Sequence, residues 1–137
     1  MKRKAKIVFY TNRNNKVRIL LGKRNFSENE YFWWIPGGSI EQGENEFEAL
    51  QRELSEELVL TSDQQEILST FKDSLPKSYT YTSANSSVTV FFIKLSEENL
   101  PQIVDEFNEI QWFEKNNLPD NMSREFQHIQ EIIKSLE

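Results

Sequence analysis

Three glutamates in one short stretch have the residue type and spacing of a divalent-cation site: Glu53, Glu56 and Glu57. In a helix, positions three and four residues apart lie on one face, so these carboxylates would be neighbours. Like charges at this spacing repel by about 0.2–0.5 kcal/mol per pair. No lysine lies between them, so the charge that relieves the repulsion is expected from elsewhere. Mg²⁺ prefers carboxylate oxygens and shares them with substrate phosphates, so the spacing is compatible with a magnesium-binding face, but a solvated acidic surface is the more common outcome of such a charge run.

The stretch that must carry these carboxylates also has the apolar spacing of a helix. Phe47, Leu50, Leu54 and Leu58 recur every three or four residues and form one stripe. A second stripe follows the candidate N-cap Ser123 and consists of Phe126, Ile129, Ile133 and Leu136. The sequence has one histidine, His128, which disfavours Ser-His and multi-histidine sites. Because it falls in this second stretch, it is interpreted as an ordinary helix residue.

β-branched and aromatic runs around these helices predict strands. The runs cover residues 5–10, 16–21, 31–36, 66–71, 78–82, 87–95 and 109–113. Residues 11–15, TNRNN, favour a turn, so the first two strands are predicted to form a hairpin. The run 87–95 is apolar on both faces, which indicates a central strand. The order of elements predicts one domain over residues 1–137, of α/β or α+β class, with a mixed sheet flanked by helices.

The composition excludes several classes of site and disfavours some classes of partner. The chain has no cysteine, which excludes disulfides, thiolate zinc sites and cysteine nucleophiles. Its formal net charge of −6 disfavours a nucleic-acid partner, although a bound cation would still allow a small phosphate to bind. No run approaches the roughly 20 apolar residues of a membrane span, and the N-terminus lacks the pattern of a signal peptide. We therefore expect a cytoplasmic protein, away from membranes, that is a monomer or a homodimer.

Around the glutamates the sequence resembles the Nudix box. That motif is written as Gly, five residues, Glu, seven residues, Arg-Glu-aliphatic-x-Glu-Glu-x-Gly-aliphatic. The chain departs from it at Val59, where the family has glycine, and matches it at Gly38, Glu44, Arg52, Glu53, Glu56 and Glu57. Six such matches arise by chance on the order of several times in a million. The resemblance implies the Nudix α/β/α sandwich and a Mg²⁺-dependent pyrophosphohydrolase, with Mn²⁺ as a substitute cation.

The resemblance also implies roles for individual residues. It assigns metal binding to the three box glutamates and to the backbone at Gly38. Arg52 would orient a box carboxylate through an ion pair, and Glu44 is its natural partner, although Glu44 also suits the positive end of a helix. Family members often use a further carboxylate outside the box. The matching position selects Glu106 first and Glu109 second, with an ordinary acidic loop as the alternative.

Substrate contacts are expected outside the box. Lys23 and Arg24, at the end of the second predicted strand, are candidates to bind phosphate, because a guanidinium binds phosphate in a bidentate manner. Trp34 offers a stacking surface for a base, as do Tyr31 and Trp33, although aromatic residues in strands commonly belong to the core. Asn121 resembles in position an amide that reads a purine edge in MutT-like members.

The activity implied is hydrolysis of a nucleoside diphosphate linked to another group. The first candidate substrate is a nucleoside triphosphate, including oxidised or non-standard ones, converted to the monophosphate and pyrophosphate. Nucleotide sugars, ADP-ribose, dinucleoside polyphosphates and RNA 5′ ends remain alternatives. A non-catalytic nucleotide sensor is an alternative of another class, but such a domain has no need of three crowded carboxylates.

Val59 predicts a different end to the carboxylate helix. A β-branched residue pays roughly 1–2 kcal/mol to enter the left-handed conformation that glycine commonly adopts there. We therefore expect an extended chain through Val59 and Leu60. Because the box ligands lie before this point, the departure predicts a change in helix ending and no loss of function.

Overall fold

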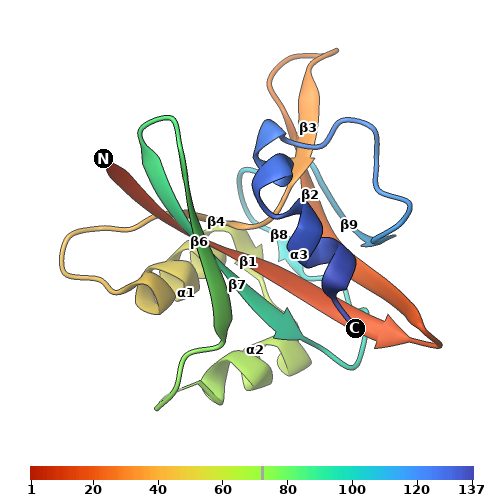
Figure 1. Cartoon of the computed structure of the whole chain (residues 1–137), viewed down its shortest axis with the longest axis horizontal. Helices are drawn as coiled ribbons and strands as arrows, with labels where there is room; N and C mark the ends of the chain where they lie inside the picture. The colour runs from red at the N-terminus through yellow and green to blue at the C-terminus, as the bar shows by residue number, and fades with distance from the viewer. Residues whose placement is uncertain (72) are drawn as a thin grey trace.

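A seven-stranded mixed sheet forms the centre of the fold in the computed structural model, which describes residues 1–71 and 73–137 (Figure 1). Its strands are β1 (Lys2–Arg13), β2 (Lys16–Asn25), β3 (Tyr31–Trp34), β4 (Gly37–Ser39), β6 (Lys77–Ser83), β7 (Ser86–Lys94) and β9 (Glu109–Glu114). The strand order is β3-β2-β1-β7-β6, with β4 also paired to β1 and β9 to β2. β1 and β7 run parallel, and the other described pairs are antiparallel.

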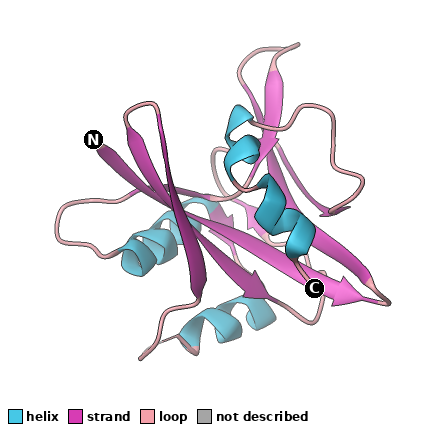
Figure 2. Cartoon of the chain, in the orientation of Figure 1, coloured by secondary structure: helices cyan, strands magenta, loops and turns pink. Residues whose placement is uncertain are grey.

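Helices cover the two faces of this sheet (Figure 2). They are α1 (Glu46–Glu57), α2 (Ser62–Ser69), the 3₁₀ helix η1 (Arg124–His128) and α3 (Gln130–Ser135). One buried cluster joins α1 and α2 to Ile7 and Phe9 of β1, whereas a second cluster joins α3 to Val8 on the other face of the same strand. The predicted mixed sheet flanked by helices is therefore confirmed. No helix in the described part of the chain has the length and apolar character needed to cross a membrane.

The sheet follows the sequence patterns at most positions. The predicted hairpin is present, and its turn at Asn14 and Asn15 has positive φ angles of 57° and 64°, which asparagine tolerates better than most residues. The predicted central strand is β7, which pairs with β1 on one side and β6 on the other. Phe91 packs in the α1 cluster and Val90 in the α3 cluster, so β7 is apolar on both faces because both faces are covered.

Residues 66–71 are not a strand, so that prediction was wrong. Most of this run belongs to α2, which begins after Thr61. The Thr61 amide donates to the Gln64 side chain at 3.0 Å, as in a capping box. Gln64 and Leu68 are buried four residues apart, at helical spacing. A short apolar run does not by itself distinguish helix from strand, and the helix start signal lay upstream of the run.

The predicted C-terminal helix is divided into η1 and α3, with Ile129 between them. Its cap is confirmed, because the Ser123 hydroxyl accepts a hydrogen bond from the Glu125 amide at 3.2 Å. Ile129 and Ile133 are buried against the sheet, as the stripe predicted. His128 lies in the 3₁₀ segment, and its ring stacks on Tyr81 with centroids 4.4 Å apart.

The carboxylate helix ends without a left-handed residue at Val59. Leu58, the C-cap, is extended (φ −139°, ψ 153°), and Leu58–Val59 forms strand β5. β5 pairs antiparallel with β8 (Gln102–Ile103) in a separate two-stranded sheet. The prediction that the chain continues in an extended form is confirmed. The helix ends in a short strand paired with β8, so no glycine in the left-handed conformation is needed there.

Val59→Gly is expected to lower the free energy of unfolding by about 0.5–1 kcal/mol, because glycine loses more backbone entropy in a strand. The measurement is urea unfolding, with Val59→Ala as the matched control for loss of the half-exposed side chain. A more stable Val59→Gly protein would contradict this account and would mean that the helix prefers a left-handed ending.

Candidate functional site

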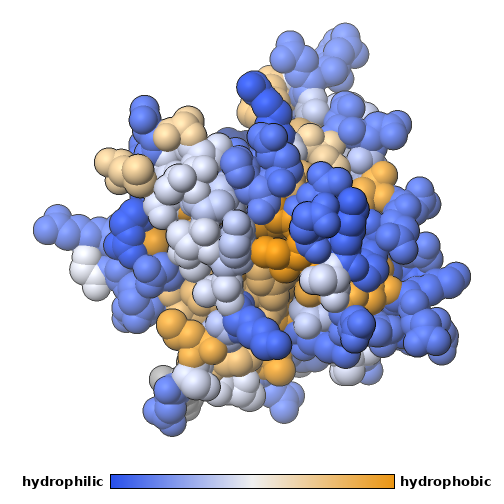
Figure 3. All heavy atoms as spheres, viewed as in Figure 1, coloured by the Kyte–Doolittle hydropathy of each residue, from blue (hydrophilic) through white to orange (hydrophobic). Residues whose placement is uncertain are grey.

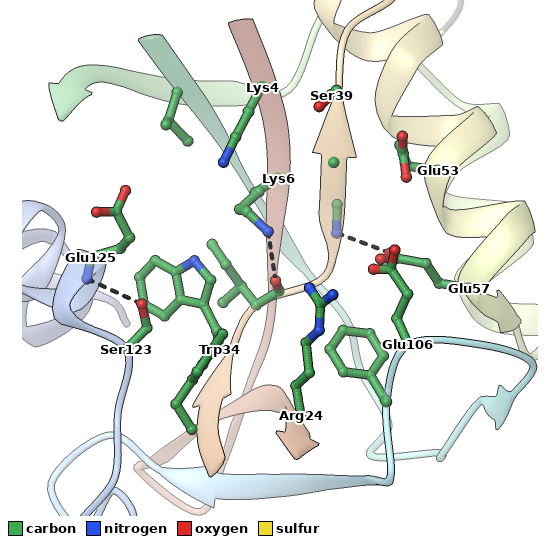
Figure 4. A pocket seen from close by; sticks show the side chains of 16 residues that line it. Lys4, Lys6, Arg24, Trp34, Ser39, Glu53, Glu57, Glu106, Ser123 and Glu125 are labelled. Carbon is green, nitrogen blue, oxygen red and sulfur yellow. Dashed lines mark hydrogen bonds between the residues drawn. The ribbon is translucent and has the colours of Figure 1, made fainter. Parts of the chain in front are cut away.

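A cleft of about 340 Å³ lies where β1 to β4 meet the C-terminal half of α1 (Figure 4). Its lining includes four carboxylates and three cations: Glu53, Glu57, Glu106 and Glu125, and Lys4, Lys6 and Arg24. Figure 4 shows the side chains of Glu57 and Glu106 facing each other from the helix and from a loop. The cleft therefore combines acidic groups with cations suited to an anionic ligand.

A second hollow lies on another part of the surface. Between β6 and α3, hydrophobic atoms reach the surface (Figure 3), and Phe92, Ile132 and Leu136 line a hollow there. Glu137 is the one acidic residue in its described lining. The carboxylate cleft is therefore the candidate for catalytic chemistry.

The N-terminus of α1 fixes the helix that presents the carboxylates. Asn45 forms a capping box with Glu48: the Asn45 amide donates to Glu48 Oε1 at 2.9 Å, and the Glu48 amide donates to Asn45 Oδ1 at 2.8 Å. Leu50 and Leu54 are fully buried against the sheet. This burial turns the neighbouring face of α1 towards β4, so that Glu53 and Glu57 approach the β4 backbone.

The two glycines of β4 allow this close approach. A Cβ at Gly38 would lie 2.4 Å from the Glu53 carboxyl carbon, so no other residue fits there unless Glu53 moves. Gly37 has φ +134°, a conformation that L-residues rarely adopt, and its amide donates to Glu57 Oε1 at 3.1 Å. Both glycines therefore place backbone directly against box carboxylates.

Arg52 holds several carboxylates together. Its Nε donates to Glu44 Oε2 at 2.7 Å and its Nη2 to Glu44 Oε1 at 3.1 Å, so the predicted ion pair is present. This hydrogen-bonded pair lowers the pKa of Glu44. Nη2 also donates to the Ser39 carbonyl at 2.8 Å, which ties the helix to β4.

Arg52 also contacts the glutamate face, so part of the charge that relieves its repulsion comes from within the same helix. Arg52 Nη1 donates to Glu53 Oε1 at 3.2 Å and to Glu56 Oε1 at 3.1 Å. Arg52 lies about 100° around the helix axis from Glu53, but its long side chain carries five donors that reach several partners. Glu56 is held by this contact, is 57% exposed and is not part of the cleft lining.

Burial dominates the electrostatics at Glu57, whose residue is 2% exposed. Burial raises the pKa of Glu57, and the nearby Glu106 carboxyl raises it further. Lys6 opposes this shift, and burial in turn lowers the pKa of Lys6. Lys6 Nζ donates to the Ile35 carbonyl at 3.3 Å. A buried carboxyl with a second carboxyl beside it holds its proton more tightly, and a positive charge placed next to it favours the charged form.

The donor set fits a hard cation, although the side chains are not gathered around one point. Among residues 1–71 and 73–137, no three His, Cys, Asp or Glu side chains are arranged to hold a metal ion. Mg²⁺ keeps several waters and needs only a few protein carboxylates. Burial raises the pKa of Glu53 as it does that of Glu57, so both carboxyls would gain from a cation. Glu53 and Glu57 are the residues that would hold it, and Glu106 lies beside Glu57 in the same cleft.

The other candidates for substrate contact differ in position. Arg24 and Trp34 line the cleft, and the buried Trp34 Nε1 has no hydrogen-bond partner among residues 1–71 and 73–137. Lys23 does not line the cleft, and its ammonium lies 4.3 Å from the Tyr31 ring centroid. Asn121 is exposed, and its carbonyl accepts from the Trp33 amide at 2.7 Å.

Sequence reasoning missed several residues that line the cleft. Lys4 and Lys6 alternate with the apolar residues of β1, and a lysine inside a strand pattern was the available signal. Glu125 also lines the cleft, where it accepts from Tyr81 Oη at 3.0 Å and from Ser83 Oγ at 2.9 Å. No sequence pattern indicates Glu125, because its partners lie more than 40 positions away. Glu109 is exposed on β9 and does not line the cleft.

Comparison with known proteins identifies one family. The family model described as NUDIX domain matches residues 1–134. None of the curated proteins matches the sequence significantly. Solved structures with a similar fold include a C. elegans Ap4A hydrolase in a binary complex (TM-score 0.65, 20% identity, covering 98% of this chain and 93% of that one).

Two further structures show the same likeness. The Nudix hydrolase RenU from M. smegmatis has a TM-score of 0.68 and 17% identity, with 98% of this chain and 86% of that chain covered. The NUDIX domain of Shewanella oneidensis NrtR, complexed with ADP ribose, has a TM-score of 0.63 and 15% identity, with 96% and 85% covered. At these identities the likeness shows a shared fold.

Glu57→Gln is expected to stabilise the metal-free protein, and more so at pH 8 than at pH 5. Folding raises the pKa of Glu57, so the folded protein retains a proton that the unfolded chain releases above about pH 4.3. The stability that this group contributes therefore falls as the pH rises, and glutamine removes the effect. Urea unfolding in EDTA measures it. An equal effect at both pH values would contradict the raised pKa.

Proposed function

Because the chain belongs to the NUDIX domain family, we propose that it is a metal-dependent hydrolase of phosphoanhydride bonds in a nucleoside diphosphate linked to another group. The observation that carries this proposal is the meeting of Glu53, Glu57 and Glu106 in one cleft with Lys6 and Arg24. Acidic groups suit a cation, and the cations opposite them suit phosphate. A domain that only binds nucleotides would not need several crowded carboxylates whose burial makes them costly to ionise.

The box residues divide into two roles in this proposal. Glu53 and Glu57 hold the cation, which when bound neutralises phosphate oxygens and lowers the pKa of the attacking water. Arg52 orients Glu53 and is itself fixed by Glu44. Glu56 reaches the cleft only if its contact with Arg52 opens, so in this arrangement it contributes through Arg52.

The remaining groups act on the substrate. Arg24 and Lys6 bind phosphate oxygens and balance the charge that develops on them. Glu106 is the candidate to accept the proton of the attacking water, because its side chain lies in the cleft beside Glu57. A new bond forms between the water oxygen and one phosphorus, and the bond from that phosphorus to the bridging oxygen breaks. The bridging oxygen leaves with the second phosphate group.

The first candidate substrate is a nucleoside triphosphate, including oxidised or non-standard ones, which would yield a monophosphate and pyrophosphate. Trp34, in the cleft wall, and Asn121 remain candidates for contact with the base. Dinucleoside polyphosphates and ADP-ribose are the alternatives that gain support from the fold neighbours, one an Ap4A hydrolase and another complexed with ADP ribose. Nucleotide sugars and RNA 5′ ends share the same chemistry. Mg²⁺ is the proposed cation, with Mn²⁺ as a substitute.

A panel of these substrates, incubated with the purified protein and Mg²⁺ or Mn²⁺, tests the proposal. Measurement of pyrophosphate, orthophosphate and nucleoside monophosphate identifies which bond is cut. Turnover that EDTA abolishes is expected for at least one substrate. Binding without turnover across the panel would favour the nucleotide-sensor alternative instead.

Glu57→Gln is expected to lower kcat by about two to three orders of magnitude, because a neutral amide cannot replace the carboxylate at the cation. Initial rates at saturating Mg²⁺ measure this loss. Circular dichroism checks that the fold persists. Wild-type turnover in this variant, or full wild-type activity in excess EDTA, would refute the metal assignment.

Glu106 and Glu109 provide a matched pair of acidic residues. Glu106→Gln is expected to lower kcat by about 10²-fold, as for the loss of a group that transfers a proton. Glu109→Gln should change kcat by less than about threefold, because Glu109 is exposed on β9, outside the cleft lining. Small, equal effects of the two changes would show that Glu106 does not serve the reaction.

A further inference from the structure

Gly22 lies in the interior of β2, where it pairs with Trp34 of β3 and Ile110 of β9. A Cβ added at Gly22 would lie 2.3 Å from Cδ1 and 2.4 Å from Cε1 of the Phe107 ring. Glycine weakens a strand, and inside one it commonly marks a place where another group approaches closely. The ring of Phe107 occupies the space that any side chain at position 22 would need.

Phe107 follows a residue with an unusual backbone conformation. Glu106 has φ +70°, in the left-handed region, and such a residue keeps this conformation only where its surroundings hold it. Asp105 supplies local support: its Oδ1 accepts from the Glu106 amide, and its carbonyl accepts from the Phe107 amide, both at 2.9 Å. The left-handed turn at Glu106 and the ring on Gly22 are therefore adjacent parts of one short loop.

Both ends of this loop are fixed to the elements that carry the cleft. The amides of Val104 and Asp105 donate to the Glu57 carbonyl at 2.8 and 3.2 Å. The Asn108 amide donates to the Lys23 carbonyl at 2.8 Å. The loop thus joins the last residue of α1 to β2. Glu106, at the turn of the loop, points its carboxylate towards Glu57 (Figure 4).

We infer that Gly22 and Phe107 are positioning residues: the ring seated on the glycine holds the loop so that the Glu106 carboxylate faces Glu57. Neither residue needs to touch the reacting atoms. The contact acts through Glu106, and its effect on turnover rests on the proposed function. Its effect on the loop itself does not.

Gly22→Ala is expected to lower kcat by about 10- to 100-fold, because the added methyl displaces the ring and misplaces Glu106. KM should change by less than about threefold, since the residues that bind phosphate keep their places. Phe107→Ala, which adds no atom to the strand, should give a similar loss. Leu100→Ala is the matched control, because Leu100 is 54% exposed and should leave kcat unchanged.

Two double variants separate positioning from general damage. In the Phe107→Ala background the methyl of Gly22→Ala meets no ring, so it should lower kcat by less than about threefold further. In the Glu106→Gln background it should also add less than about threefold, because the group it displaces is already absent. Losses that multiply in full in both backgrounds would overturn the inference.

Amide hydrogen exchange provides a readout that needs neither substrate nor metal. Gly22→Ala should speed exchange at Val104 and Asp105 by at least about tenfold and leave the amides of β7 unchanged. Unchanged exchange, or faster exchange with wild-type kcat in an active enzyme, would overturn the inference. A wild-type protein that hydrolyses nothing in the panel would refute the proposed function, and exchange alone would then decide whether Gly22 and Phe107 fix the loop.

Discussion

The burial of the Glu57 carboxyl is the constraint on which the rest of the site depends. A carboxylate removed from water and placed beside a second carboxyl is costly to ionise unless positive charge approaches it. The protein supplies part of that charge through Lys6, and the Gly37 amide donates a hydrogen bond to the carboxyl. In the proposed function, the remaining positive charge would come from a divalent cation, which keeps several of its own waters and binds phosphate oxygens. Burial of the Glu57 carboxyl would therefore favour binding of a positively charged ligand beside it.

The same residue also organises the backbone around the cleft. The Glu57 carbonyl accepts the two amides that begin the Glu106 loop, while its carboxyl faces the cleft. Directly after it the chain extends into β5, where Val59 stands in place of the family glycine. The ending of the helix, the small β5-β8 sheet and the placement of Glu106 are therefore consequences of one backbone arrangement. This arrangement explains how the substitution leaves the box residues in position.

Arg52 shows why charge patterns on a helix are hard to interpret from positions alone. Its Cα lies off the glutamate face, yet its guanidinium bonds Glu44, Glu53 and Glu56 together. Repulsion along the helix is therefore relieved by an internal cation at the outer edge. Glu57 and Glu106 meet at the inner end of the helix, where Lys6 and the Gly37 amide offset part of the cost of ionising Glu57. Side-chain reach, and not sequence spacing, sets which carboxylates remain available for a ligand.

The sequence by itself determined the class of fold, the carboxylate helix, most strands, the Arg52–Glu44 pair and the extended ending at Val59. The resemblance to the Nudix box implied the Arg52–Glu44 pair, whereas the other features depend on local periodicity, capping and backbone sterics, which act between residues close in the chain. It did not determine that residues 66–71 join a helix, that Lys6 and Glu125 line the cleft, or that Phe107 sits on Gly22. Tertiary structure decided these points, because strand register and packing bring together groups far apart in the chain, and burial then sets their charge.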